Sequence, residues 1–180
     1  NSSGGTGTRG ILFGGYGGSP ASAKSTIDYL TVSTLGNTED FGDISGTTNY
    51  RAGAAASRTR GIMAGGIPET ADIHFVTIAS TGNSTDFSNL TDSRRGPAGC
   101  GSQTRAIFGG GFHNPSHVDI IDSHTITSSA DAIDFGNLSE GRARAGAFSS
   151  SVRAVFGNGK TGTTTEFNTI DYVTISTQGD

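Results

Sequence analysis

The strongest constraint on the fold is one short motif that occurs four times along the chain. Each copy places an arginine before a short apolar run and ends in glycine or asparagine–glycine, at residues 8–15, 59–66, 104–111 and 152–159. The arginines are Arg9, Arg60, Arg105 and Arg153, which gives a period of about 48 residues. A fixed period of this length is typical of repeat proteins, in which each unit packs against its neighbours. The sequence therefore predicts four structural repeats.

Three further segments recur within each repeat. Small residues come first, at 52–57, 97–102 and 145–150, with residues 1–6 in the same place at the start. Such low side-chain volume predicts strands crowded around a common axis. The arginine motif reads as a buried strand, and its glycines permit a bulge or a close backbone approach. A loop of variable length separates it from the third segment.

The third segment is rich in β-branched and aromatic residues, as strands prefer, at 27–32, 73–78, 121–126 and 170–175. Its apolar side chains fall on both faces, which predicts a sheet covered on both sides. Turn residues follow at 35–37, 81–83 and 177–179. The fourth segment begins with Asp-Phe, at 40–44, 86–90 and 134–138. Its fourth copy is missing before Asp180, so we expect the last repeat to have three strands.

No window shows a sustained helical period with capping signals, so we expect an all-β chain with essentially no helix. We expect one domain over residues 1–180, divided into approximate repeats 1–50, 51–93, 94–141 and 142–180. A net charge of −4 gives no reason to expect nucleic acid, and the apolar runs are too short to insert into a membrane. A single cysteine, Cys100, excludes an internal disulfide framework. We expect it to be a small buried core residue rather than a nucleophile. Because the chain starts at Asn1 without a signal-like segment, we expect it to be processed or part of something longer.

Four short strands per period, with glycines after the second, resemble kelch repeats. Asp28-Tyr29, Gly36-Asn37, Phe41, Ile44 and Arg51 occupy the kelch positions in order. Kelch repeats favour tryptophan at the large aromatic position, whereas this chain has Phe41, Phe87 and Phe135. The resemblance implies a kelch-like β-propeller of four blade-like repeats, which either closes by itself or forms part of a larger ring.

The exact residue sequence of the repeat points to a narrower group of proteins. Strings such as Ile-Asp-Tyr-Val-Thr-Ile-Ser-Thr (170–177) resemble repeats in predicted tail-fibre and virion proteins of marine cyanophages. That resemblance implies an extracellular or virion location and a structural or adhesive role, with assembly of a fibre or filament and recognition of a host surface. The alternative from another class is a secreted carbohydrate-binding propeller. Only Tyr16, Phe112 and Phe167 present aromatics on the variable loop, and they are not in equivalent places.

The sequence offers few candidates for chemistry, and we expect no enzyme activity and no cofactor. His113, His117 and Asp119 lie in one loop and could bind a metal with help from His124, but no helix aligns the imidazoles, so a solvated polar loop is favoured. Residues 157–161 resemble the end of a phosphate-binding loop, but Ala154 replaces the required first glycine. A catalytic site usually appears as a set of reactive residues in one copy of the repeat that the other copies lack, and the sequence shows no such set.

The four motif arginines could form an anion-binding ring. The simpler interpretation is that each pairs with a carboxylate, either at Asp28, Asp122 and Asp171 or at Asp40, Asp86 and Asp134. Candidate glycosylation sequons begin at Asn1, Asn83, Asn89 and Asn137, of which Asn83 at a hairpin tip is the best acceptor. The edge of strand 170–175 lacks a fourth strand beside it, so we expect another copy, or a neighbouring repeat, to pair there.

Overall fold

The computed structural model describes residues 2–5, 8–34, 36–46, 50–162 and 165–177. These residues form strands, turns and bends but no helix, so none of them forms a helix that could cross a membrane. The predicted all-β class is confirmed. Asn1 and parts of two predicted turns, Leu35 and residues 178–179, lie outside the described residues.

Within these described ranges, fifteen strands form four antiparallel sheets, here called sheets I to IV. Sheet I contains β1 (Ser2–Gly5), β2 (Arg9–Gly17), β3 (Ser22–Thr31) and β4 (Glu39–Asp43). Sheet II contains β5 (Gly53–Ala56), β6 (Arg60–Ala64), β7 (Thr70–Thr77) and β8 (Thr85–Arg94). Sheet III contains β9 (Ala98–Gly101), β10 (Arg105–Gly109), β13 (Ile120–Thr125) and β14 (Ile133–Asn137). Sheet IV has only β15 (Gly146–Ser149), β16 (Arg153–Gly157) and β19 (Ile170–Thr174), with β19 at its edge.

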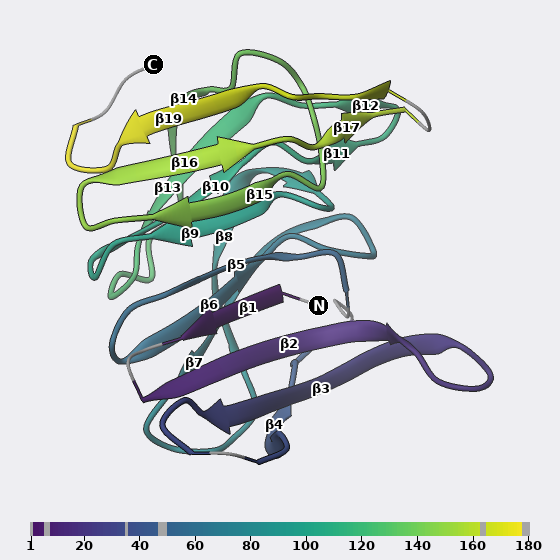
Figure 1. The fold of residues 1–180 in the computed structure, drawn as a ribbon, viewed down its shortest axis with the longest axis vertical. Coiled ribbons are helices and arrows are strands. Elements are labelled where there is room, and N and C mark those ends of the chain that lie inside the picture. Colours follow the sequence, from purple (N-terminus) through teal and green to yellow (C-terminus); the bar gives the residue numbers. More distant parts are fainter. Residues whose placement is uncertain (1, 6–7, 35, 47–49, 163–164, 178–180) are drawn as a thin grey trace.

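The variable loops of the third and fourth repeats each contain a short hairpin that the sequence does not predict. One pairs β11 (Phe112–His113) with β12 (Ser116–His117), and the other pairs β17 (Lys160–Thr161) with β18 (Thr165–Glu166). Both project beyond the same end of their sheets (Figure 1). The two hairpins lie beside each other, because His117 of the first contacts the hydroxyl of Thr161 of the second at 3.1 Å.

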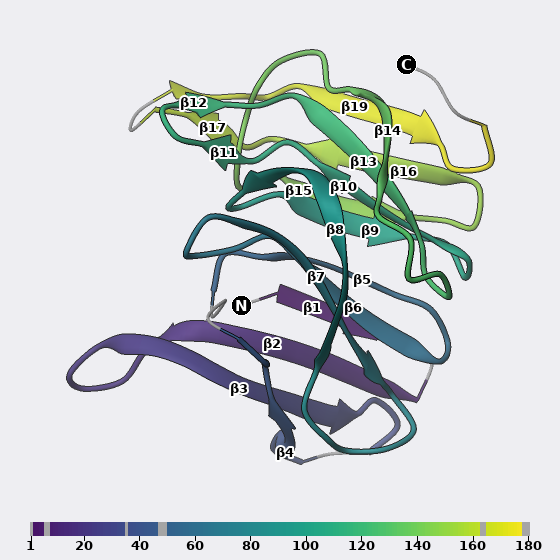
Figure 2. The same cartoon turned by 180° about the vertical axis from the view of Figure 1, so that it is seen from behind.

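The four sheets stack in chain order, with sheet I and sheet IV at opposite ends of the stack (Figures 1 and 2). The small-residue strands lie against one another from sheet to sheet: β1 contacts β5, β5 contacts β9, and β9 contacts β15. The prediction that these strands crowd together is therefore confirmed. The described residues do not close into a ring, so the closed four-blade version of the propeller is wrong.

Glycine permits this crowding at one decisive position. A Cβ atom added to Gly99 on β9 would lie 2.5 Å from the carbonyl oxygen and 2.6 Å from the nitrogen of Ala54 on β5. Backbone atoms cannot rotate away as a flexible side chain can, so only glycine allows the two strands to approach this closely.

The hydrophobic core is divided into three clusters, each lying between two consecutive sheets. Residues from sheets I and II make the first: Ile11, Phe13, Ile27, Phe41, Ile44, Ala54, Met63, Val76 and Ile78. Equivalent residues make the other two, between sheets II and III and between sheets III and IV. Cys100 belongs to the third cluster, and burial raises the pKa of its thiol to about 12. Each sheet is therefore covered by its neighbours rather than by elements of its own repeat.

The recurrent aromatic of the fourth segment is not equally buried in its three copies. Phe41 and Phe135 are buried and pack with Val76 and Val173 of the next sheet. Phe87 is only half-buried, because the equivalent residue of the next sheet is His124, whose ring centroid lies 5.0 Å from that of Phe87. Phe87 therefore packs against the core cluster between sheets II and III without being enclosed by it.

Candidate functional site: sheet junctions and a cationic pocket

The motif arginines connect each sheet to the next, but not through carboxylates. Nη1 of Arg9, Arg60 and Arg105 donates to the carbonyl oxygens of Ile78, Ile126 and Ile175, at 2.7, 2.8 and 2.8 Å. Three of the four guanidinium groups also stack on an aromatic ring of their own sheet: Arg9 on Tyr29, Arg60 on Phe75 and Arg153 on Tyr172. The predicted Arg–carboxylate pairs are therefore replaced by Arg–carbonyl contacts between sheets. These arginines do not converge into an anion-binding ring.

A second set of arginines makes the carboxylate pairs. Arg94 of sheet II and Asp122 of sheet III form an ion pair of 2.7 Å whose side chains are both fully buried. Arg142, which follows sheet III, pairs with Asp171 of sheet IV at 2.5 Å. Burial acts to raise the pKa of Asp171, but hydrogen bonds from Arg142 and Ser139 outweigh it and leave that pKa lowered. Two of the three junctions thus contain the same cross-sheet pair.

The two ends of the stack expose the residues that the junctions bury. On β3 of sheet I, Asp28 occupies the place of Asp122 and Asp171, and it has no partner among the described residues. Val32 is 57% exposed, whereas Ile78, Ile126 and Ile175 in the same place are at most 3% exposed. At the other end, Ile170 is 68% and Tyr172 is 62% exposed. Ile27, Ile73 and Ile121, in the place of Ile170, are all completely buried.

The structure does not bring the candidate metal ligands together. Phe112 pairs with His117, and His113 with Ser116, across the β11–β12 hairpin, so the two histidines point to opposite faces. His113 contacts the carboxylate of Asp92 at 2.8 Å, and His117 contacts the hydroxyl of Thr161 at 3.1 Å. His124 is buried beside Ser88, while Asp119 is exposed. The described residues contain no group of three metal-ligating side chains.

The three described sequon asparagines are exposed. Two of them already make contacts across a junction. Oδ1 of Asn83 accepts a hydrogen bond from the backbone of Asp43 at 2.9 Å, and Nδ2 of Asn89 donates to Asp131 at 3.2 Å. Asn83 thus has a structural role at the tip where the sequence predicts the best glycan acceptor.

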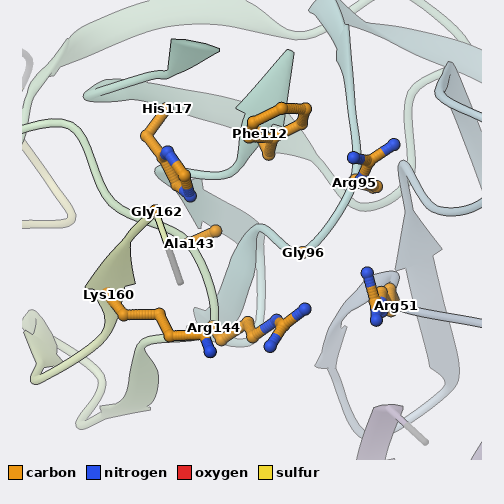
Figure 3. Close-up of a pocket in the computed structure, with 9 residues that line it drawn as sticks. All are labelled: Arg51, Arg95, Gly96, Phe112, His117, Ala143, Arg144, Lys160 and Gly162. Atoms are coloured by element: carbon orange, nitrogen blue, oxygen red, sulfur yellow. The ribbon is translucent and has the colours of Figure 1, made fainter. Parts of the chain in front are cut away.

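A cavity of about 250 Å³ opens where the connections between repeats meet the two short hairpins (Figure 3). It is lined by Arg51, Arg95, Gly96, Phe112, His117, Ala143, Arg144, Lys160 and Gly162. We call it the cationic pocket, because four arginine and lysine residues line it and none of its described lining residues is acidic. Figure 3 shows Lys160 running toward Arg144, with the His117 ring pointing toward the same space from the opposite wall.

The cations of the pocket differ in how they are neutralised. Arg95 pairs with Glu69 at 2.6 Å and lies over the ring of Phe112 at 4.3 Å. Arg51, Arg144 and Lys160 form no ion pair among the described residues. Glu166 is the strand partner of Lys160 in the β17–β18 hairpin and borders an adjoining cavity. Its carboxylate forms no ion pair with the Lys160 ammonium group. The pocket therefore contains three positive charges without acidic partners.

The positive charges around the pocket affect the pKa of His117. Burial lowers the pKa of its imidazole, and the nearby Arg144, Arg95 and Lys160 lower it further. Its Nδ1 contacts the Thr161 hydroxyl, and its ring meets Phe112 edge-on with centroids 4.9 Å apart. Burial and the nearby positive charges both favour the neutral form of the His117 ring.

The backbone beneath the pocket has an unusual conformation. Arg51 and Arg144 have φ angles of 58° and 60°, and Gly96 occupies the equivalent place with φ of 69°. The three residues are linked in a row, because Gly96 N–H donates to Arg51 at 2.6 Å and Arg144 N–H donates to Gly96 at 3.1 Å. A bulky residue in this region costs on the order of 1 kcal/mol relative to glycine.

Comparison with known proteins gives no family: no protein-family model matches the chain, and no curated protein matches it significantly. Sequence reasoning missed the cationic pocket, because Arg51 comes from a different repeat than Arg144 and Lys160, and those two lie 16 residues apart. The one available signal is that Arg51 and Arg144 follow the fourth segment at matching places of the repeat.

Proposed function

We propose that this chain is a structural and adhesive repeat module of an extracellular or virion fibre, and that its four sheets form an arc of a kelch-like propeller. The observation that carries the proposal is that both ends of the stack expose an apolar position, Val32 at one end and Ile170 at the other, that every internal junction buries. An additional sheet docked at either end would repeat contacts that the chain already makes three times.

At the sheet I end, Asp28 is a carboxylate without an arginine. Asp122 and Asp171 in the equivalent place each pair with an arginine that lies at the end of the preceding sheet or just after it, so a preceding sheet would supply an arginine to Asp28. Val32 would become buried as Ile78, Ile126 and Ile175 are. At this end, charge and apolar surface both favour one more unit of the same repeat.

At the sheet IV end, Arg153 occupies the place of the arginines that donate to the next sheet. Its guanidinium is aligned over Tyr172 with a centroid distance of 4.6 Å. The N–H of Ile175 donates to the carbonyl of Val152 within sheet IV, so by strand alternation the N–H groups of Tyr172 and Thr174 face the open edge. The partners that fit this end are another copy of the chain or a neighbouring repeat, paired along residues 170–175.

Sedimentation velocity of residues 1–180 over a range of concentrations tests the proposal. We expect concentration-dependent assembly that Tyr172→Lys or Val32→Lys weakens, because each places a charge on one end face. Ile133→Lys is the matched control, since Ile133 is an exposed apolar residue away from the end faces. A monomer at every concentration, with rapid hydrogen exchange at Tyr172 and Thr174, would show that nothing covers these faces.

A further inference from the structure

We propose that the cationic pocket binds a small ligand that carries an oxyanion, that is, a carboxylate, sulfate or phosphate group. This inference goes beyond the assembly function, because the pocket is lined by residues of one chain and is distinct from the sheet I and sheet IV end faces. Three observations support it independently: the charge of the pocket, its shape and its backbone.

The pocket concentrates positive charge. The chain has a net charge of −4, yet Arg51, Arg144 and Lys160 lie around one cavity and have no acidic partner in the part of the chain that the structure describes. Like charges gathered in a concave site repel one another and focus a positive potential into the cavity. A bound oxyanion would relieve that repulsion and would accept hydrogen bonds from guanidinium and ammonium groups.

The walls of the pocket suit a ligand with a charged group and an apolar part. Arginine binds the two oxygens of a carboxylate, sulfate or phosphate with a planar pair of donors, while lysine provides a compact charge. The Phe112 ring supplies an apolar wall, and the Glu69–Arg95 ion pair holds Arg95 over that ring. A cavity of about 250 Å³ with an apolar wall has room for an organic body as well as the charged group. An acidic saccharide has both parts.

Two arginines of the pocket have a backbone conformation that favours glycine. The place occupied by Arg51, Gly96 and Arg144 requires a left-handed conformation, and glycine fills it without strain in the third repeat. A chain with 29 glycines nevertheless places arginine at the two other copies. Strained conformations of this kind persist where a side chain is needed at a ligand site. Both of these side chains line the pocket.

The test is isothermal titration calorimetry at constant ionic strength with sodium sulfate, sodium phosphate, glucuronate and glucose. We expect the oxyanions to bind and glucose not to bind. Binding of sulfate and phosphate alone would identify the charged group as the whole ligand. Tighter binding of glucuronate would identify an acidic saccharide, as expected for a carbohydrate-binding propeller. The absence of binding by every oxyanion at 10 mM, or equal binding of glucose, would overturn the proposal.

Variants separate binding from folding. Arg144→Gly and Arg51→Gly should each weaken oxyanion binding at least tenfold while leaving the thermal midpoint unchanged or higher, because glycine is the unstrained residue at that φ. The control pair is Arg144→Gln and Arg58→Gln, since Arg58 is exposed, does not line the pocket and carries the same charge. If Arg58→Gln weakens binding as much as Arg144→Gln, the interaction depends only on net charge and the pocket is not the site.

Discussion

Arg94 and Asp122 join two sheets through a side-chain contact of 2.7 Å from which water is fully excluded. Phe108 O also accepts from Arg94 at 3.4 Å, and the hydroxyl of Thr91 donates to Asp122 at 2.5 Å. A charge buried at this depth is tolerated only while its partner remains. The pair therefore fixes the register of sheet III against sheet II.

Removing one member of this pair should be strongly destabilising. Arg94→Met or Asp122→Leu alone should lower the free energy of unfolding by about 3–5 kcal/mol, because each leaves an uncompensated buried charge. The double variant should recover most of that loss, since a well-packed apolar pair avoids the desolvation cost. Urea denaturation of the wild type, both single variants and the double variant measures the coupling. Additive losses would show that the two side chains act independently.

The unequal burial of the recurrent phenylalanines predicts unequal costs of truncation. Phe135→Ala should lower the free energy of unfolding by about 3–5 kcal/mol, the usual cost of emptying an aromatic core site. Phe87→Ala should cost less, because Phe87 is half-exposed and packs on Phe75 and His124. Chemical denaturation of both variants under identical conditions makes the comparison. A larger loss for Phe87 would contradict the packing between sheets II and III.

The close approach of β5 and β9 predicts that Gly99 does not tolerate a methyl group. Gly99→Ala should lower the thermal midpoint markedly, because the new Cβ would lie 2.5 Å from a backbone atom of Ala54. Gly17→Ala is the matched control, since a Cβ there meets nothing within 4 Å. Differential scanning calorimetry of both variants gives the answer. Equal midpoints would mean that the inner strands lie farther apart.

Acid should destabilise the fold through its histidines. Burial lowers the pKa of His74, His117 and His124 below the ordinary value of 6.5, so the unfolded chain binds protons first as pH falls. The free energy of unfolding should therefore be highest above pH 6.5 and should decrease between pH 6.5 and 5. Denaturation midpoints in urea at pH 7.5, 6.5 and 5.5 measure the slope.

A single variant isolates one part of this pH dependence. His124→Val places at this position the residue found at Val76 and Val173 in the equivalent strands, so it removes one titrating group while keeping an apolar side chain. The slope between pH 6.5 and 5.5 should become shallower than that of the parent. An unchanged slope would mean that His124 takes up its proton equally well in the folded and unfolded chains.

The strands could be predicted from the sequence because their signals are local. Small residues, the arginine motif and the β-branched segment each recur within a few positions, and together they mark the strands of all four sheets. The contacts between sheets could not be predicted in the same way. Arg94 and Asp122 are 28 residues apart, and no local pattern distinguishes Arg94 from the adjacent Arg95, which pairs with Glu69 instead.

The cationic pocket shows the same limit more clearly. Arg51 and Arg144 belong to different repeats, and Lys160 reaches the cavity from a short hairpin inside the variable loop. No property of any one segment indicates that these side chains share a cavity. The metal candidates fail for the opposite reason: His113 and His117 are close in sequence, but strand alternation separates their side chains.

The division of the core into three clusters between sheets affects how such a chain can change length during evolution. Every junction is complete in itself, so the insertion or deletion of one unit of about 48 residues exchanges one set of sheet-to-sheet contacts for an equivalent set. The number of units is therefore free to vary while the folding rules stay the same. The stability of an inner unit depends on two neighbours and that of an end unit on one, so unfolding should begin at the ends and progress inward.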